Sequence, residues 1–194
     1  MSRRLLVILS LMLLPIGCTG RDFTRASLDS LAAGTTTEAD IRQKFGTPYR
    51  DGLLIKNNET MKALNYAYER TAWSADAGVV PARAQEFFFW RGLLVGHHFT
   101  SSFARDTTDF DGAKAQQIRK GETTEAAVIG LLGPPQGIHR YPLIADQRAR
   151  AAVYLYERTK VSASSTTLYR QVLVVQYDPA GTVTDVEYIV TGER

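Results

Sequence analysis

The chain has 194 residues, of which 44% are hydrophobic, enough for one medium domain or two small ones with an ordinary core. Its formal charge is +3, but two of its 23 basic residues lie in a leader-like segment, so the rest of the chain is nearly neutral. The basic residues are scattered and form no stripe, which argues against nucleic-acid binding. Cys18 is the only cysteine, which excludes an intramolecular disulfide.

Residues 1–18 are predicted to be a lipoprotein signal peptide. Two arginines precede the apolar run Leu5–Ile16, whose twelve residues are too few to span a bilayer. A glycine precedes Cys18, as in a bacterial lipobox, so we expect Cys18 to be the lipidated mature N-terminus, although Leu14 lies one place too early for the usual pattern. Cleavage after Gly20, which would give a secreted soluble protein, is the alternative.

A fifteen-residue phrase occurs twice in the chain. Gly34–Pro48 and Gly121–Pro135 share seven of fifteen positions at an offset of 87, and residues 66–71 and 154–159 share five of six at an offset of 88. This period is too long for a solenoid repeat and predicts a duplicated small domain. The predicted boundaries are residues 19–104 for the first repeat, 105–112 for the linker and 113–194 for the second repeat.

Each repeat is predicted to begin with two helices. In the first repeat, residues 26–33 form a helix that ends at Gly34, where a left-handed backbone costs glycine little. Thr36 is expected to cap the next helix, at residues 37–45, and Glu38 falls in its first turn, where the helix dipole favours negative charge. The corresponding residues of the second repeat are Gly121, Thr123 and Glu125.

Three strands are predicted to follow in each repeat. Alternation of Leu64, Tyr66 and Tyr68 with small or polar residues indicates a half-buried strand. The predicted strands cover residues 62–73, 86–90 and 93–99 in the first repeat and residues 148–159, 169–177 and 183–190 in the second. The predicted fold class is therefore α+β, with two tandem ααβββ units that each pack a helix pair on a small antiparallel sheet.

This order of a G-x-T-x-E helix, a G-x-P turn and a Y-x-Y strand resembles the SmpA/OmlA (BamE-like) family of outer-membrane lipoproteins. Two such units in one chain are also similar in architecture to the β-lactamase inhibitory proteins. The first resemblance implies a lipid-anchored accessory or scaffold protein at the outer membrane, facing the periplasm, that assists outer-membrane protein assembly or envelope integrity. The second implies the alternative, a secreted or tethered inhibitor of a periplasmic enzyme.

The three histidines do not form a metal motif. His97 and His98 are adjacent, so in a strand they point to opposite faces, and His139 lies in the other repeat. No nucleophile elbow, zinc-binding helix motif or phosphate-binding glycine loop is present in the sequence. We therefore expect no metal, no cofactor and no small-molecule substrate.

Three glutamates leave hydrolysis conceivable, because Glu69, Glu86 and Glu157 could meet across a sheet. Glu69 and Glu157 are each followed by arginine at the same place in the two repeats, which fits cross-strand charge pairs better. The prediction is that the protein is not an enzyme.

The first repeat has more aromatic residues than its short helices could cover. Tyr49, Trp73, Phe88 and Trp90 are the predicted partner-binding residues, because aromatic side chains are enriched at protein interfaces. The expected partner is another envelope protein, which the sequence does not identify. The alternative is that these aromatic residues fill the seam between the two repeats.

Overall fold

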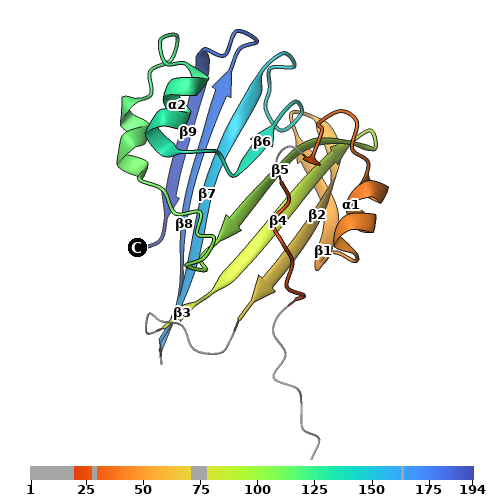
Figure 1. Cartoon of the computed structure of the whole chain (residues 1–194), viewed down its shortest axis with the longest axis vertical. Coiled ribbons are helices and arrows are strands. Elements are labelled where there is room, and N and C mark those ends of the chain that lie inside the picture. The colour runs from red at the N-terminus through yellow and green to blue at the C-terminus, as the bar shows by residue number, and fades with distance from the viewer. Residues whose placement is uncertain (1–19, 28–29, 71–77, 163) are drawn as a thin grey trace, which may run out of the picture.

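The computed structural model describes residues 20–27, 30–70, 78–162 and 164–194, and its principal element is one antiparallel sheet of nine strands (Figure 1). The strands are β1 (Arg50–Lys56), β2 (Glu59–Glu69), β3 (Val79–Val80), β4 (Ala82–Trp90), β5 (Leu93–Ser101), β6 (Gly137–His139), β7 (Arg150–Val161), β8 (Thr166–Tyr177) and β9 (Val183–Thr191). The helices are α1 (Glu38–Phe45), the 3-10 helix η2 (Gly112–Gln117) and α2 (Glu125–Leu132). Within these described ranges, no helix has the length and apolarity needed to cross a membrane.

Each repeat contributes four neighbouring strands to the main path of the sheet. The order is β1-β2-β4-β5 from the first repeat and then β6-β7-β8-β9 from the second, while β3 pairs with β7 beside this path. The two halves join where residues 96–98 of β5 pair with residues 137–139 of β6. The strands of both repeats therefore form one continuous sheet.

The predicted fold class is wrong in two respects. The chain does not form two separate ααβββ units, because the free edge of β5 pairs with β6, a short strand that is not among those predicted from the sequence. Each repeat also lacks the expected helix pair among its described residues. The first repeat has one α-helix, α1, and the second has one α-helix, α2, which follows the 3-10 helix η2. Such short segments gain too few helical hydrogen bonds to offset the cost of the first turn without more packing. The repeat boundaries remain a prediction.

The repeated glycines perform the same task in both halves. Gly34 and Gly121 have φ angles of 86° and 77°, as expected for residues that end a helical turn. Their N–H groups donate to the carbonyl oxygens of Leu94 and Val183, at 2.8 and 2.7 Å. Each glycine therefore ends a turn and also ties it to a strand of the sheet.

The predicted helix caps are displaced by one residue. The N-caps of α1 and α2 are Thr37 and Thr124, not Thr36 and Thr123. The hydroxyls of Thr36 and Thr123 instead accept the backbone N–H four residues earlier, at 3.1 and 2.8 Å. Two successive threonines are thus used in each repeat, the first to close the turn before the helix and the second to cap the helix.

The structure explains why the Y-x-Y sequence recurs together with the phrase. The hydroxyls of Tyr66 and Tyr154 donate to the carbonyl oxygens of Gly46 and Gly133, at 3.0 and 2.9 Å. These two glycines end α1 and α2 with φ angles of 77° and 79°. Burial raises the pKa of Tyr154 to about 12, so this hydroxyl keeps its proton and continues to donate at neutral pH.

One face of the sheet packs against the helices, with α1 over the strands of the first repeat and α2 over those of the second (Figure 1). In the first repeat the buried cluster on this face contains Ala26, Leu31, Ile41, Leu64, Tyr66, Phe87, Phe89 and Leu94. In the second repeat it contains Phe110, Ala115, Ile118, Val128, Ala152, Tyr154, Tyr156, Tyr169, Leu173, Val175, Tyr177 and Val183. The opposite, helix-free face is where the two repeats differ.

Candidate functional site

The helix-free face of the first repeat is covered by the segment between β6 and β7, residues 140–149. Leu143 of this segment lies in a buried cluster with Met61, Phe88 and Val95 from β2, β4 and β5. The segment is also fixed at the β1–β2 turn, where Asn57 Nδ2 donates to the carbonyl oxygen of Pro142 at 2.8 Å. This half of the helix-free face is therefore a second core between the two repeats.

Two of the four predicted partner-binding aromatics lie in this second core. Phe88 is buried, and its ring meets the edge of His139 with 5.8 Å between ring centroids. Trp90 contacts Tyr141 edge-to-face at 5.3 Å, and its Nε1–H donates to Glu59 at 2.9 Å. Both side chains thus contact the second repeat, the alternative arrangement that the sequence left open.

The other predicted site residues do not join Phe88 and Trp90. Tyr49 is exposed just before β1, with the guanidinium of Arg50 over its ring at 5.3 Å. Trp73 and the predicted lipidation residue Cys18 lie outside the described residues. A partner-binding role for any of these four aromatics stays a prediction.

The helix-free face of the second repeat is open. A groove of about 440 Å³ runs over β7, β8 and β9, walled on one side by residues 143–145 and the β1–β2 turn. Its apolar lining is Leu143, Ile144, Ala145, Val153, Leu155, Val172, Val174 and Ile189. Its polar lining is Lys56, Asn57, His98, His139, Arg170, Gln176, Glu187 and Thr191. The groove thus combines an apolar floor with polar and charged side chains.

A polar chain crosses from the first repeat to this groove. Asn65 Nδ2 donates to Glu86 at 2.8 Å, Glu86 contacts His98 Nε2 at 3.0 Å, and His98 Nδ1 lies 3.3 Å from His139 Nε2. Burial by itself would raise the pKa of Glu86, but its bonds to His98 and Asn65 outweigh burial and leave that pKa below its ordinary value. Glu86 is therefore held as a carboxylate beside His98.

A second charged pair lies on the same face. Glu157 of β7 is directly opposite Arg170 of β8, and their side chains form an ion pair of 3.1 Å. Burial raises the pKa of Glu157, although Arg170 opposes this shift. Glu157 therefore forms the predicted kind of cross-strand pair, whereas Glu69 lies opposite Ala82.

These groups provide polar contacts rather than a recognisable reaction centre. Glu86 and Glu157 each have a fixed cationic or imidazole partner, so both carboxylates are engaged in the folded protein. His97 points to the helix side and is buried, as the strand periodicity predicted, while His98 faces the groove. In the described part of the chain, no three His, Cys, Asp or Glu side chains are placed to hold a metal ion.

The contact between His98 and His139 was not predicted from the sequence, because β6 is not among the predicted strands. Two glycines carried a usable signal. A Cβ atom at Gly137 would lie 2.1 Å from the carbonyl oxygen of His97, and one at Gly96 would lie 2.2 Å from Leu143. Glycine inside a strand pattern often marks such a close approach of backbone or side chain.

Comparison with known proteins gives no family for the chain. No protein-family model matches it, and no curated protein matches it. Among solved structures, it is similar to a chain from Streptococcus mutans described as a "putative beta-lactamase inhibitor protein", with a TM-score of 0.43 and 13% identity, over 83% of this chain and 91% of that chain. At this TM-score the likeness carries no argument, and the similarity to the SmpA/OmlA family stays a resemblance.

Proposed function

We propose that this chain is a non-enzymatic protein-binding protein of the bacterial cell envelope, which docks a partner protein in the groove over β7, β8 and β9. The observation that carries the proposal is the contrast between the two halves of the helix-free face. Leu143 closes the first half, whereas in the second half, among described residues, the groove lining includes the part-buried Val172 and Val174 and the exposed Ile189. Ile144 and Ala149 of the same segment pack beside Val174 at the edge of this groove. Exposed apolar surface bordered by polar groups is typical of interaction sites.

The composition of the groove favours a protein partner over a small ligand. Protein interfaces combine an apolar centre with a polar rim, and here Lys56, Arg170 and Glu187 border the apolar floor. The occupant that fits is a protein loop with an apolar anchor residue and charged neighbours of both signs.

We further propose that the protein is tethered through a lipid on Cys18 to the outer membrane and faces the periplasm as an accessory or scaffold protein. The support is the leader in the sequence: an apolar run too short to span a bilayer, followed by glycine and the only cysteine. A lipid tether would keep a binding protein close to partners in the same membrane.

The docking proposal can be tested with two matched isoleucine substitutions. Ile189 is 47% exposed and lines the groove, whereas Ile129 is 40% exposed on α2. Wild-type protein, Ile189→Asp and Ile129→Asp would be solubilised from native membranes and compared by sedimentation velocity. We expect wild type and Ile129→Asp to sediment in the same complex and Ile189→Asp to sediment alone.

The measurement has clear alternative outcomes. Circular dichroism of the purified variants would verify that all three chains are folded. An intact complex with Ile189→Asp would contradict docking in the groove. A complex whose partner is an enzyme that loses activity when bound would assign the inhibitor function instead of the scaffold function.

A further inference from the structure

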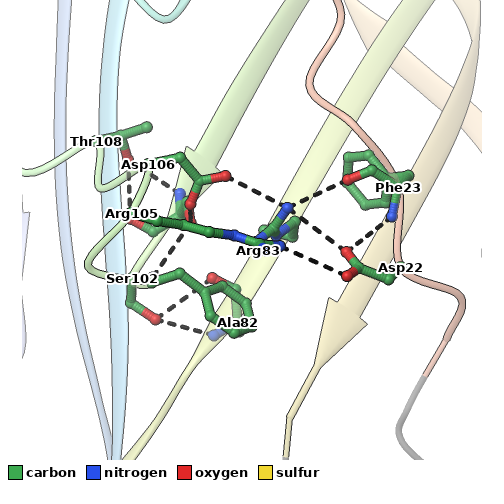
Figure 2. Close-up of polar contacts among 10 residues, drawn as sticks. Asp22, Phe23, Ala82, Arg83, Ser102, Arg105, Asp106 and Thr108 are labelled. Carbon is green, nitrogen blue, oxygen red and sulfur yellow. Dashed lines mark hydrogen bonds and ion pairs between the residues drawn. The ribbon is translucent and has the colours of Figure 1, made fainter. Parts of the chain in front are cut away.

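A buried arginine fixes the start of the described chain to the sheet. The side chain of Arg83 in β4 is only 3% exposed, and it forms ion pairs with Asp22 at 3.5 Å and with Asp106 at 3.4 Å (Figure 2). Its Nη1 also donates to the carbonyl oxygen of Phe23 at 3.2 Å. Its guanidinium lies 4.5 Å from the centre of the Phe103 ring. The guanidinium of Arg83 in β4 therefore contacts both the N-terminal segment and the segment after β5.

Apolar contacts fix the same segment along the sheet. The ring of Phe23 lies 6.5 Å from that of Phe45 and 6.4 Å from that of Phe99, in edge-to-face arrangements. Just before it, Gly20 forms a bridge with Tyr68, close to the end of β2. These contacts determine where the chain enters the folded body.

The entry point lies at one end of the sheet. Figure 1 shows the N-terminal segment running beside β4 and β2 toward the end where β3 lies, and away from the end that carries α2. Cys18 precedes Gly20 by two residues, which can span at most about 7 Å. A lipid on Cys18 would therefore hold this end of the sheet at the bilayer surface.

The same end carries cationic and apolar side chains that face solvent. Arg21, Arg70 and Lys160 are exposed, and none has an acidic partner within 4.0 Å among the residues that the structure describes. Val161 and Leu168, at the β7–β8 end, are exposed aliphatic residues. We call these five residues the membrane rim.

We propose that the membrane rim rests on an anionic phospholipid surface, so that the strands stand away from the bilayer and the groove faces sideways along it. This inference rests on the lipid anchoring proposed above, and it adds which end of the molecule meets the membrane. Three rim residues are cationic, and one exposed carboxylate, Glu193, lines the same hollow as Lys160 and Leu168, so the rim presents an excess of positive charge to an anionic surface. Each basic residue near such a surface strengthens binding about fivefold.

The orientation can be measured on the lipidated protein from membranes, reconstituted into vesicles of phosphatidylcholine and phosphatidylserine. The lipid would occupy the only native thiol, so an introduced cysteine takes a single fluorophore. One label replaces Thr167, which pairs with Lys160 at the rim, in Thr167→Cys. The other is Ala180→Cys, in the exposed turn between β8 and β9 at the opposite end. Lipids that carry a nitroxide quencher at the headgroup report contact with the bilayer.

We expect strong quenching at Thr167→Cys and little at Ala180→Cys. Neutralising the rim with Arg21→Gln, Arg70→Gln and Lys160→Gln should lower the population of the docked orientation on the order of a hundredfold. A matched set at the opposite end, Arg91→Gln, Arg119→Gln and Arg148→Gln, removes the same charge and should leave the quenching unchanged.

The outcomes separate this inference from the proposal on which it rests. A lipidated protein with equal quenching at both labels, or with quenching that survives loss of the three rim charges, overturns the orientation and leaves the anchoring intact. An intact mass without lipid on Cys18 overturns the anchoring itself, and the orientation with it.

Discussion

The two halves of the helix-free face show how one sequence duplication gives a core in one place and a free surface in another. On the helix side the repeats are equivalent, with the same turn, the same kind of cap and the same tyrosine bond. On the other side they diverge after the G-x-P turn. In the first repeat the chain continues as β1, a strand of seven residues, whereas in the second it leaves the sheet after the three residues of β6. Residues 140–149 then cross to cover the first repeat.

This difference indicates that a single connection decides which face remains free. The segment that leaves β6 supplies Leu143 to the cluster around Phe88, and its neighbour Tyr141 packs on Trp90. No described segment of the first repeat makes an equivalent crossing over β8 and β9. The uncovered half is therefore where we propose partner binding.

The largest expected effect is at Leu143, which is 3% exposed between the repeats. Leu143→Ala should lower the free energy of unfolding by about 2–5 kcal/mol, the usual range for a buried leucine that leaves a cavity. The matched control is Leu168→Ala, on the free half at 52% exposure, which should cost much less. Urea denaturation of both variants gives the comparison, and equal losses would show that the first half is not a closed core.

The buried His97 allows a pH test of the helix side of the sheet. Burial on the helix side lowers the pKa of His97 from 6.5 to about 4. Between these values the unfolded chain binds a proton that the folded chain does not, so stability is complete above pH 6.5 and falls as the pH drops toward about 4. The expected loss is about 3 kcal/mol.

The measurement for His97 is the free energy of unfolding as a function of pH, in the wild type and in His97→Phe. Neither ring nitrogen of His97 has a hydrogen-bond partner in the structure, so phenylalanine should be tolerated at neutral pH. The variant should lose this part of the pH dependence. An unchanged pH profile would contradict the burial of a neutral His97.

The two tyrosine bonds test the equivalence of the repeats on the helix side. Tyr66→Phe and Tyr154→Phe each remove one hydrogen bond to a glycine carbonyl, and each should cost about 1 kcal/mol. Thermal or urea unfolding of the two single variants measures both losses. A large loss in one repeat only would show that the repeated phrase no longer has one physical role.

The smallest expected difference concerns the helix caps. Thr37 caps α1 in a reciprocal box with Asp40, whereas Thr124 caps α2 with Ala127 at the matching place. We expect Thr37→Ala to cost about 1 kcal/mol and Thr124→Ala somewhat less. The free energies of unfolding of the two variants decide this. Asp40→Ala is the control that removes the two bonds that the Asp40 carboxylate accepts, from the backbone N–H and from the hydroxyl of Thr37.

Local signals in the sequence predicted much of the secondary structure but not the assembly of the sheet. The strong strands were found within a few residues, because alternation and aromatic content act over short distances. The pairing of β5 with β6 depends on residues about 40 apart, and β6 has only three residues, so no local pattern revealed it. The single sheet could not be inferred without that pairing.

The same reason explains what was found and missed at the candidate site. Phe88 and Trp90 were identified as aromatic residues that the helices could not cover, but local sequence could not show that residues 140–149 would cover them. The groove is made of ordinary aliphatic residues such as Val172 and Ile189, which look like any strand interior in the sequence. Only the path of the chain between β6 and β7 makes one half buried and the other free.

The most direct test of this account is site-specific photo-crosslinking in native envelopes. A benzophenone amino acid at Ile189 would probe the free half, and the same amino acid at Gln147 would probe the exposed outer side of the segment that covers the first half. We predict one strong crosslinked partner from Ile189 and none from Gln147. Equal crosslinking from both positions, or crosslinking from Gln147 alone, would contradict the assignment of the groove over β7, β8 and β9 as the docking site.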